Sequence, residues 1–81
     1  MRQYLLYNMQ MVNLQQVTEI KCVKNSTVVT DGRYVKVFHY GTVILLLDLL
    51  EGKVIDEYKA SKTSTKMINR VKIHYGIPSL R

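Results

Sequence analysis

The chain has 81 residues, a length that supports a single domain, because two half-size cores would each bury too little apolar surface. Hydrophobic residues make up 47% of the sequence, which argues against intrinsic disorder, and no apolar run reaches membrane-spanning length. The formal net charge is +6 and there is one cysteine, so an intrachain disulfide is excluded, and we expect a cytoplasmic protein without a signal peptide or membrane association.

Residues 1–16 form an N-terminal segment that fits two templates. Four of its residues alternate as in a strand: Leu5, Tyr7, Met9 and Met11. Three of its apolar residues share one helical face: Leu5, Met9 and Val12. The sequence leaves both a strand and a helix open for this segment.

Residues 17–58 carry the pattern of an antiparallel β-meander of about four to five strands. The β-branched residues between positions 17 and 24 predict a half-exposed first strand. Asp31-Gly32 is a pair that type I′ hairpin turns prefer, because both positions take a positive φ. It predicts a turn in which Thr30 faces Arg33.

One strand of the meander is apolar without alternation. Tyr40-Gly41 and Gly52 mark the reversals before and after Val43–Leu47. A strand that is apolar on both sides has to be covered on both faces of its sheet. One helix covers only one face, so the other face requires the N-terminal segment or a second copy of the chain, and we expect a homodimer.

Residues 61–76 predict a C-terminal helix and complete an α+β fold. The candidate N-caps are Ser61, Thr63 and Ser64. Gly76, followed by Ile77 and Pro78, predicts a left-handed C-cap. The apolar stripe that should pack on one face of the sheet consists of Met67, Ile68, Val71 and Tyr75.

Positive charge is concentrated at the C-terminal end. Residues 1–58 hold six basic and all six acidic residues, which leaves six basic residues and no acid for residues 59–81. The residues expected to contact nucleic acid are Lys59, Lys62, Lys66, Asn69, Arg70 and Lys72. Lys62, Lys66 and Arg70 recur every four residues, about 6 Å apart along a helix, a spacing that suits a phosphate backbone. A merely solvated helix face is the alternative interpretation.

A second set of residues suggests stacking or an interface. Alternation between positions 33 and 40 places four residues on one side of a strand: Tyr34, Lys36, Phe38 and Tyr40. Aromatic residues interleaved with lysine can stack unpaired bases, whereas core packing or a dimer contact is the alternative. Ile73 lies within the basic helix face and suits a protein groove better than a phosphate backbone.

No pattern of catalytic or metal-binding residues stands out. His39, His74 and Cys22 match no metal-ligand spacing, so we assign them structural roles and expect Cys22 to be buried rather than reactive. Asp56 and Glu57 are interpreted as solvated charges rather than as a catalytic pair. We therefore expect no enzyme activity and no cofactor.

Two stretches carry a resemblance: the aromatic hairpin at 38–44 and the helix start at 61–69. Together, within residues 27–77, they resemble short uncharacterised proteins of phages and other mobile elements, which pair such a hairpin with a Ser-x-Thr-Thr-like helix start. The chain departs from that pattern at Ser64, and the resemblance transfers no site residue. It implies an accessory role. We expect a small nucleic-acid-binding protein, or alternatively a homo-oligomeric module that binds or inhibits a host protein.

Overall fold

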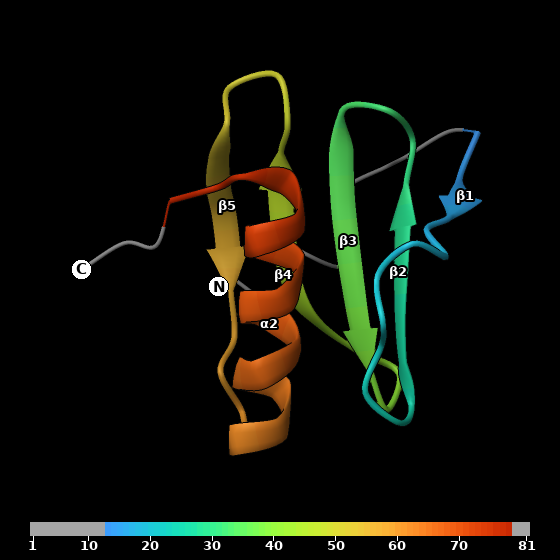
Figure 1. Cartoon of the computed structure of the whole chain (residues 1–81), viewed down its shortest axis with the longest axis vertical. Coiled ribbons are helices and arrows are strands. Elements are labelled where there is room, and N and C mark those ends of the chain that lie inside the picture. The colour runs from blue at the N-terminus through green and yellow to red at the C-terminus, as the bar shows by residue number, and fades with distance from the viewer. Residues whose placement is uncertain (1–12, 79–81) are drawn as a thin grey trace.

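The computed structural model describes residues 13–78 and confirms the α+β fold, with a five-stranded antiparallel sheet and one C-terminal helix (Figure 1). The strands are β1 (Gln15–Gln16), β2 (Ser26–Thr30), β3 (Tyr34–His39), β4 (Thr42–Asp48) and β5 (Lys53–Glu57), and the helix is α2 (Lys62–Tyr75). Each strand pairs with the next one in sequence, so the sheet is a meander. The two templates for the N-terminal segment rest on residues that lie outside the described range.

The strand expected at positions 17–24 is wrong. This stretch is irregular, and regular pairing with β3 begins only at Ser26. Val17 and Ile20 are buried while Thr18 and Glu19 between them are exposed, so burial does not alternate as in a strand. Apolar packing on the core has outweighed the local β-propensity, which is a weak preference.

The type I′ turn occurs at Tyr40-Gly41 instead of Asp31-Gly32. His39 pairs with Thr42, and the two residues between them have φ angles of 54° and 78°. Both angles are positive, as a type I′ turn requires.

The connection between β2 and β3 is longer than expected. Thr30 pairs with Val35 and not with Arg33, which corrects the predicted register. The Asp31 carboxylate accepts hydrogen bonds from the backbone N–H groups of Arg33 (3.0 Å) and Tyr34 (2.8 Å). These bonds form a side-chain-stabilised turn, which competes with the tight hairpin that Asp-Gly favours.

Both faces of β4 are buried within the single chain, as its apolar run predicts. Ile44, Leu45 and Leu47 belong to the core on the helix side, whereas Val43 and Leu46 pack with residues on the opposite face. Two neighbours can point the same way because the β3 pairing skips Ile44, which makes a β-bulge. Since a single chain already buries Val43 and Leu46, β4 does not itself require a second copy.

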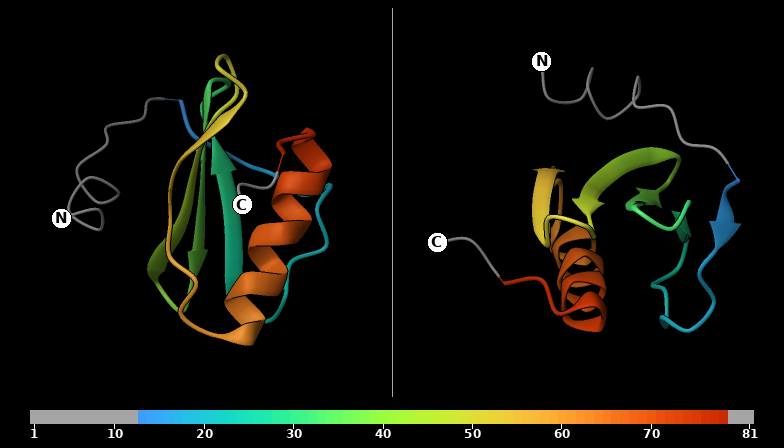
Figure 2. Two further views of the ribbon diagram at one scale, coloured as in Figure 1. Left: turned by 90° about the vertical axis from the view of Figure 1, so that its left-hand side faces the viewer. Right: turned by 90° about the horizontal axis from the view of Figure 1, so that it is seen from above.

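The helix packs on one face of the sheet, over β4 and β5, while the segment between β1 and β2 lies over the same face near β2 (Figures 1 and 2). The stripe residues Met67, Ile68 and Val71 are fully buried in the helix-side core. This arrangement confirms the predicted inward side of α2 and fixes which side faces outward.

Both ends of α2 have the predicted caps. Ser61 is the N-cap, and it forms a reciprocal capping box with Ser64: the Ser61 hydroxyl accepts from the Ser64 N–H (3.1 Å), and the Ser64 hydroxyl accepts from the Ser61 N–H (2.8 Å). Gly76 has a φ of 67° and closes the C-terminus, and Ile77 after it is buried.

Candidate functional site

The outward side of α2 is the most strongly charged surface that the sequence predicted. We call its residues the outer helix face: Lys62, Lys66, Asn69, Arg70 and Ile73. All are exposed except Arg70, which is half-buried, and Ile73 reaches 80% exposure. The two lysines form no ion pair with any residue of the range 13–78, so their charges are open to a ligand.

The flank of α2 beside β5 is neutralised by an acid. The Lys72 ammonium lies 2.6 Å from Glu57 Oε1, and the Lys59 ammonium lies 3.6 Å from Glu57 Oε2. Lys72 is only 3% exposed, so the structure does not place its ammonium group on the surface, where the predicted contact with nucleic acid requires it. Lys59 is exposed, but the same carboxylate partly neutralises its charge.

The sequence interpretation did not predict the ion pairs that Glu57 forms with Lys59 and Lys72. The C-terminal stretch contains no acid, yet the fold places the last residue of β5 against the helix. No pattern in the linear sequence signals this pairing, because it depends on how the connection after β5 carries α2 back along the strand. Asp56 and Glu57 were also expected to be solvated. Asp56 is 4% exposed and Glu57 is half-buried, so that interpretation is wrong as well.

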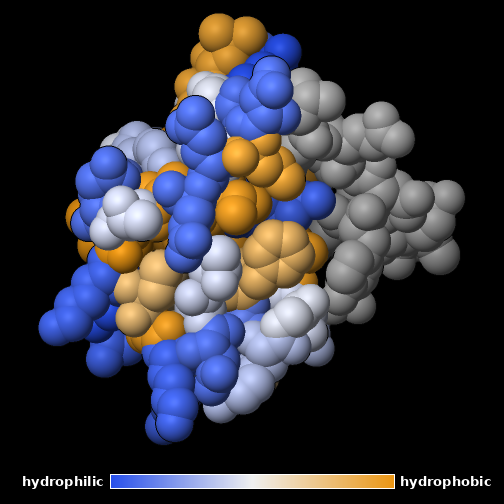
Figure 3. All heavy atoms as spheres, turned by 90° about the vertical axis from the view of Figure 1, so that its right-hand side faces the viewer, coloured by the Kyte–Doolittle hydropathy of each residue, from blue (hydrophilic) through white to orange (hydrophobic). Residues whose placement is uncertain are grey.

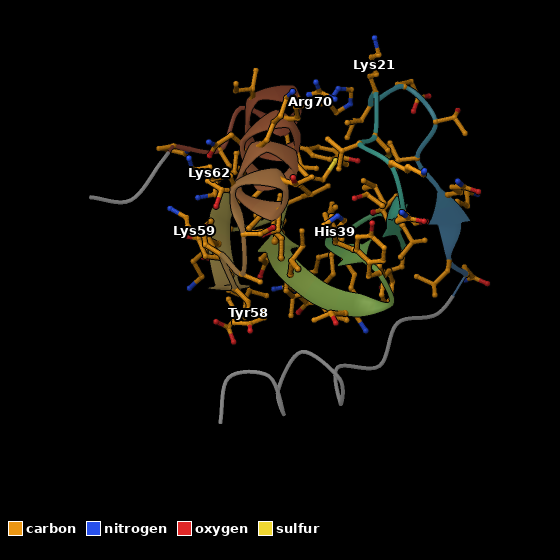
Figure 4. The ribbon with its side chains drawn as sticks, turned by 90° about the horizontal axis from the view of Figure 1, so that it is seen from below. Lys21, His39, Tyr58, Lys59, Lys62 and Arg70 are labelled. Atoms are coloured by element: carbon orange, nitrogen blue, oxygen red, sulfur yellow. The ribbon has the colours of Figure 1, made fainter. Side chains whose placement is uncertain are left out.

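The opposite flank of α2 is tied to the segment between β1 and β2. Arg70 Nη1 donates a hydrogen bond to the backbone carbonyl of Lys21 at 2.7 Å. Figure 4 shows Lys59 and Lys62 beside β5, and Arg70 directed toward the segment that carries Lys21. The two flanks therefore differ: one meets a carboxylate and the other a chain segment with exposed lysines.

The second predicted set does not join the outer helix face. Tyr34 and Phe38 are half-buried and pack against Val43 and Leu46, on the face opposite α2, as the core-packing alternative expected. Lys36 lies between them on β3 and is half-buried. Tyr40 belongs to the turn, is 72% exposed, and packs its ring edge-on against His39, with centroids 4.7 Å apart.

An Arg33–Asp48 pair ties two turns together away from the helix. The guanidinium donates to both carboxylate oxygens, at 3.2 Å and 3.0 Å, and the side chain of Asp48 is 6% exposed. Asp48 also accepts from the N–H groups of Leu50 and Glu51. Hydrogen bonding by Arg33 lowers the pKa of the Asp48 carboxyl. These bonds indicate that Asp48 has a structural role at the two turns.

The remaining candidates for chemistry are dispersed. His39 is buried, and its Nε2 has no hydrogen-bond partner among the described residues; His74 is exposed, and Cys22 is a half-buried free thiol. Between residues 13 and 78 no three acidic, histidine or cysteine side chains gather as a metal site would require, and that same part of the surface has no pocket. In this range no helix has the length and apolar character to cross a membrane.

The outer helix face therefore remains as the surface on which a functional inference can rest. Hydrophilic side chains also project from the neighbouring side of the molecule, which carries β1, β2 and the segment between them (Figure 3). Comparison of the chain with protein-family models, with curated proteins and with solved structures finds no match.

Proposed function

We propose that this chain is a small non-enzymatic protein that binds the phosphate backbone of nucleic acid through the outer helix face. The observation that supports the proposal best is the pair Lys62 and Lys66. Both are exposed, they stand one helical turn apart, and neither has a carboxylate partner among the described residues. Lysine ammonium groups held in this way can replace the counterions of a polyanion.

The contact set is narrower than the sequence predicted. Lys59 and Lys72 are left out, because Glu57 lies between them and its carboxylate repels phosphate. Asn69 stays in the set, since a side-chain amide donates hydrogen bonds to phosphate oxygens as well. The exposed large apolar side chain of α2 is Ile73, which is not aromatic, so this face offers phosphate contacts without base stacking.

Reversing both lysine charges should weaken DNA binding strongly. The double variant Lys62→Glu/Lys66→Glu should bind a short labelled DNA duplex at least about tenfold more weakly in about 50 mM salt, because two phosphate contacts become repulsions. Fluorescence anisotropy measures the affinity. Circular dichroism should match that of the unmodified chain, since both side chains are exposed.

The control for these charge reversals is Lys53→Glu, which reverses an exposed lysine at the start of β5. It should bind nearly as well as the unmodified chain. For the unmodified chain, the logarithm of the binding constant should fall linearly with the logarithm of the salt concentration. Affinity that does not change with salt would contradict the proposal.

One observation favours a second function. Ile73 is 80% exposed at the C-terminal end of the outer helix face, where a protein partner would bury it. The rival proposal is therefore a homo-oligomeric module that docks this face on an acidic host protein.

Ile73→Ser separates the two functions, because it removes apolar area without altering charge. If the chain binds nucleic acid, DNA affinity should change less than about twofold, since phosphate contacts carry it. If the chain binds a protein, the variant should lose a partner that copurifies with the unmodified chain after nuclease treatment. Loss of DNA affinity in Ile73→Ser would argue against backbone recognition.

A further inference from the structure

The segment between β1 and β2 runs alongside α2 in the opposite direction. One contact is the hydrogen bond from Arg70 to the carbonyl of Lys21. At the C-terminal end of α2, burial raises the pKa of the Tyr75 hydroxyl, and the negative charge of Glu19 raises it further. In Figure 1 the chain descends from β1 to the start of β2 while α2 rises, so the two elements pass each other in opposite directions.

One side of this segment packs on the core and the other faces solvent. Ile20 is 7% exposed and packs in the helix-side core together with the half-buried Cys22 and Val23. Lys21 between them is exposed, and Figure 4 shows its side chain pointing away from the body of the molecule on the side of Arg70. The side chain of Lys21 thus extends into solvent from a backbone that contacts Arg70.

The basic residues of α2 lead toward Lys21. Each step of four residues along an α-helix turns by about 40°, so the row Lys62, Lys66 and Arg70 winds across the outer helix face instead of running straight. It starts beside β5 and ends at Arg70, which touches the backbone of Lys21. Lys21 is therefore the next positive charge in the same row, although it lies 49 positions from Arg70 in sequence.

We propose that Lys21 is a further contact to the nucleic-acid backbone and that Arg70 is the residue that positions it. The binding surface then has two elements, α2 and the segment between β1 and β2, and it extends away from Glu57. This inference rests on the proposed function and adds a residue to it.

Lys21→Gln tests the contact without disturbing the tether, because Arg70 bonds the backbone of residue 21 and not its side chain. Affinity for the labelled duplex should fall about threefold at moderate salt, and the slope of log affinity against log salt should become shallower by about 0.9, the value for one phosphate contact. Lys53→Gln, the same change at an exposed lysine of β5, should leave both quantities unchanged.

The possible results separate two failures. If Lys62→Glu/Lys66→Glu loses binding but Lys21→Gln behaves like Lys53→Gln, the role of Lys21 is refuted and the proposed function stands. If none of these variants changes the affinity, the proposed function itself is refuted. Positioning by Arg70 is tested by a double-mutant cycle: Lys21→Gln should cost less in an Arg70→Gln background, and strictly additive losses would refute the positioning role.

Discussion

Replacing Glu57 with alanine should lower the free energy of unfolding by about 3 kcal/mol, because it leaves the Lys72 ammonium buried without its counterion. The Lys72 side chain is 4% exposed, and its amino group has only Glu57 as an ion-pair partner within the described residues. Removing one partner of a buried pair costs far more than the pair itself contributes, since the desolvated charge stays behind. Urea denaturation followed by circular dichroism measures the loss.

Two further variants make the Glu57 result specific. Glu51→Ala removes an exposed acid from the turn between β4 and β5 and should change stability by less than about 0.5 kcal/mol. The double variant Glu57→Leu/Lys72→Met replaces the whole pair by apolar groups and should recover most of the stability lost in Glu57→Ala. A Glu57→Ala variant as stable as Glu51→Ala would show that the ammonium is not desolvated.

The second large effect concerns the face of the sheet opposite α2. Leu46→Ala should lower the free energy of unfolding by about 3 kcal/mol, because Leu46 is 0% exposed and its removal leaves a cavity beside Val43. Thermal or urea unfolding of the purified variant gives the value.

Leu50→Ala is the matched control for this change. It makes the same substitution in the turn after β4, where the side chain is 72% exposed, and should cost less than about 0.5 kcal/mol. Leu45→Ala, in the helix-side core, should cost as much as Leu46→Ala. If Leu46→Ala were as mild as Leu50→Ala, the burial of this second face would be wrong.

The parts of the fold that could be predicted from the sequence depend on local signals. Ser61 and Ser64 cap the helix through side chains three residues apart, and Gly76 ends it through its own backbone angle. The uninterrupted apolar run of β4 likewise predicts burial on both faces without knowledge of its neighbours.

The turns and the first strand were harder because competing contacts decide them. Asp31-Gly32 has the right composition for a tight hairpin, but the Asp31 carboxylate captures two backbone N–H groups and lengthens the loop. Tyr40 takes the left-handed conformation that Asn or Asp adopts more readily. At positions 17–24, packing of Val17 and Ile20 on the core outweighed strand propensity. Composition alone does not reveal such long-range packing.

The candidate site also has a part that could be predicted from the sequence and a part that could not. Helical periodicity was sufficient to place Lys62 and Lys66 in solvent, because the stripe opposite them is clearly apolar. It was insufficient for Lys72 and Arg70, whose surroundings come from β5 and from the segment before β2. Charge counted along the chain therefore overstated the positive potential on one flank and missed a lysine on the other.

The bulges of the sheet have a mechanical consequence. β4 carries an extra residue, Ile44, relative to β3, and β5 carries one, Ile55, relative to β4. Extra residues of this kind increase local twist and bend a strand, and β4 is visibly curved in Figure 2. Because of this bend, the sheet is concave on the side that packs against α2. A sheet without these two extra residues would be flatter, and α2 would then present the row of basic side chains in a different direction.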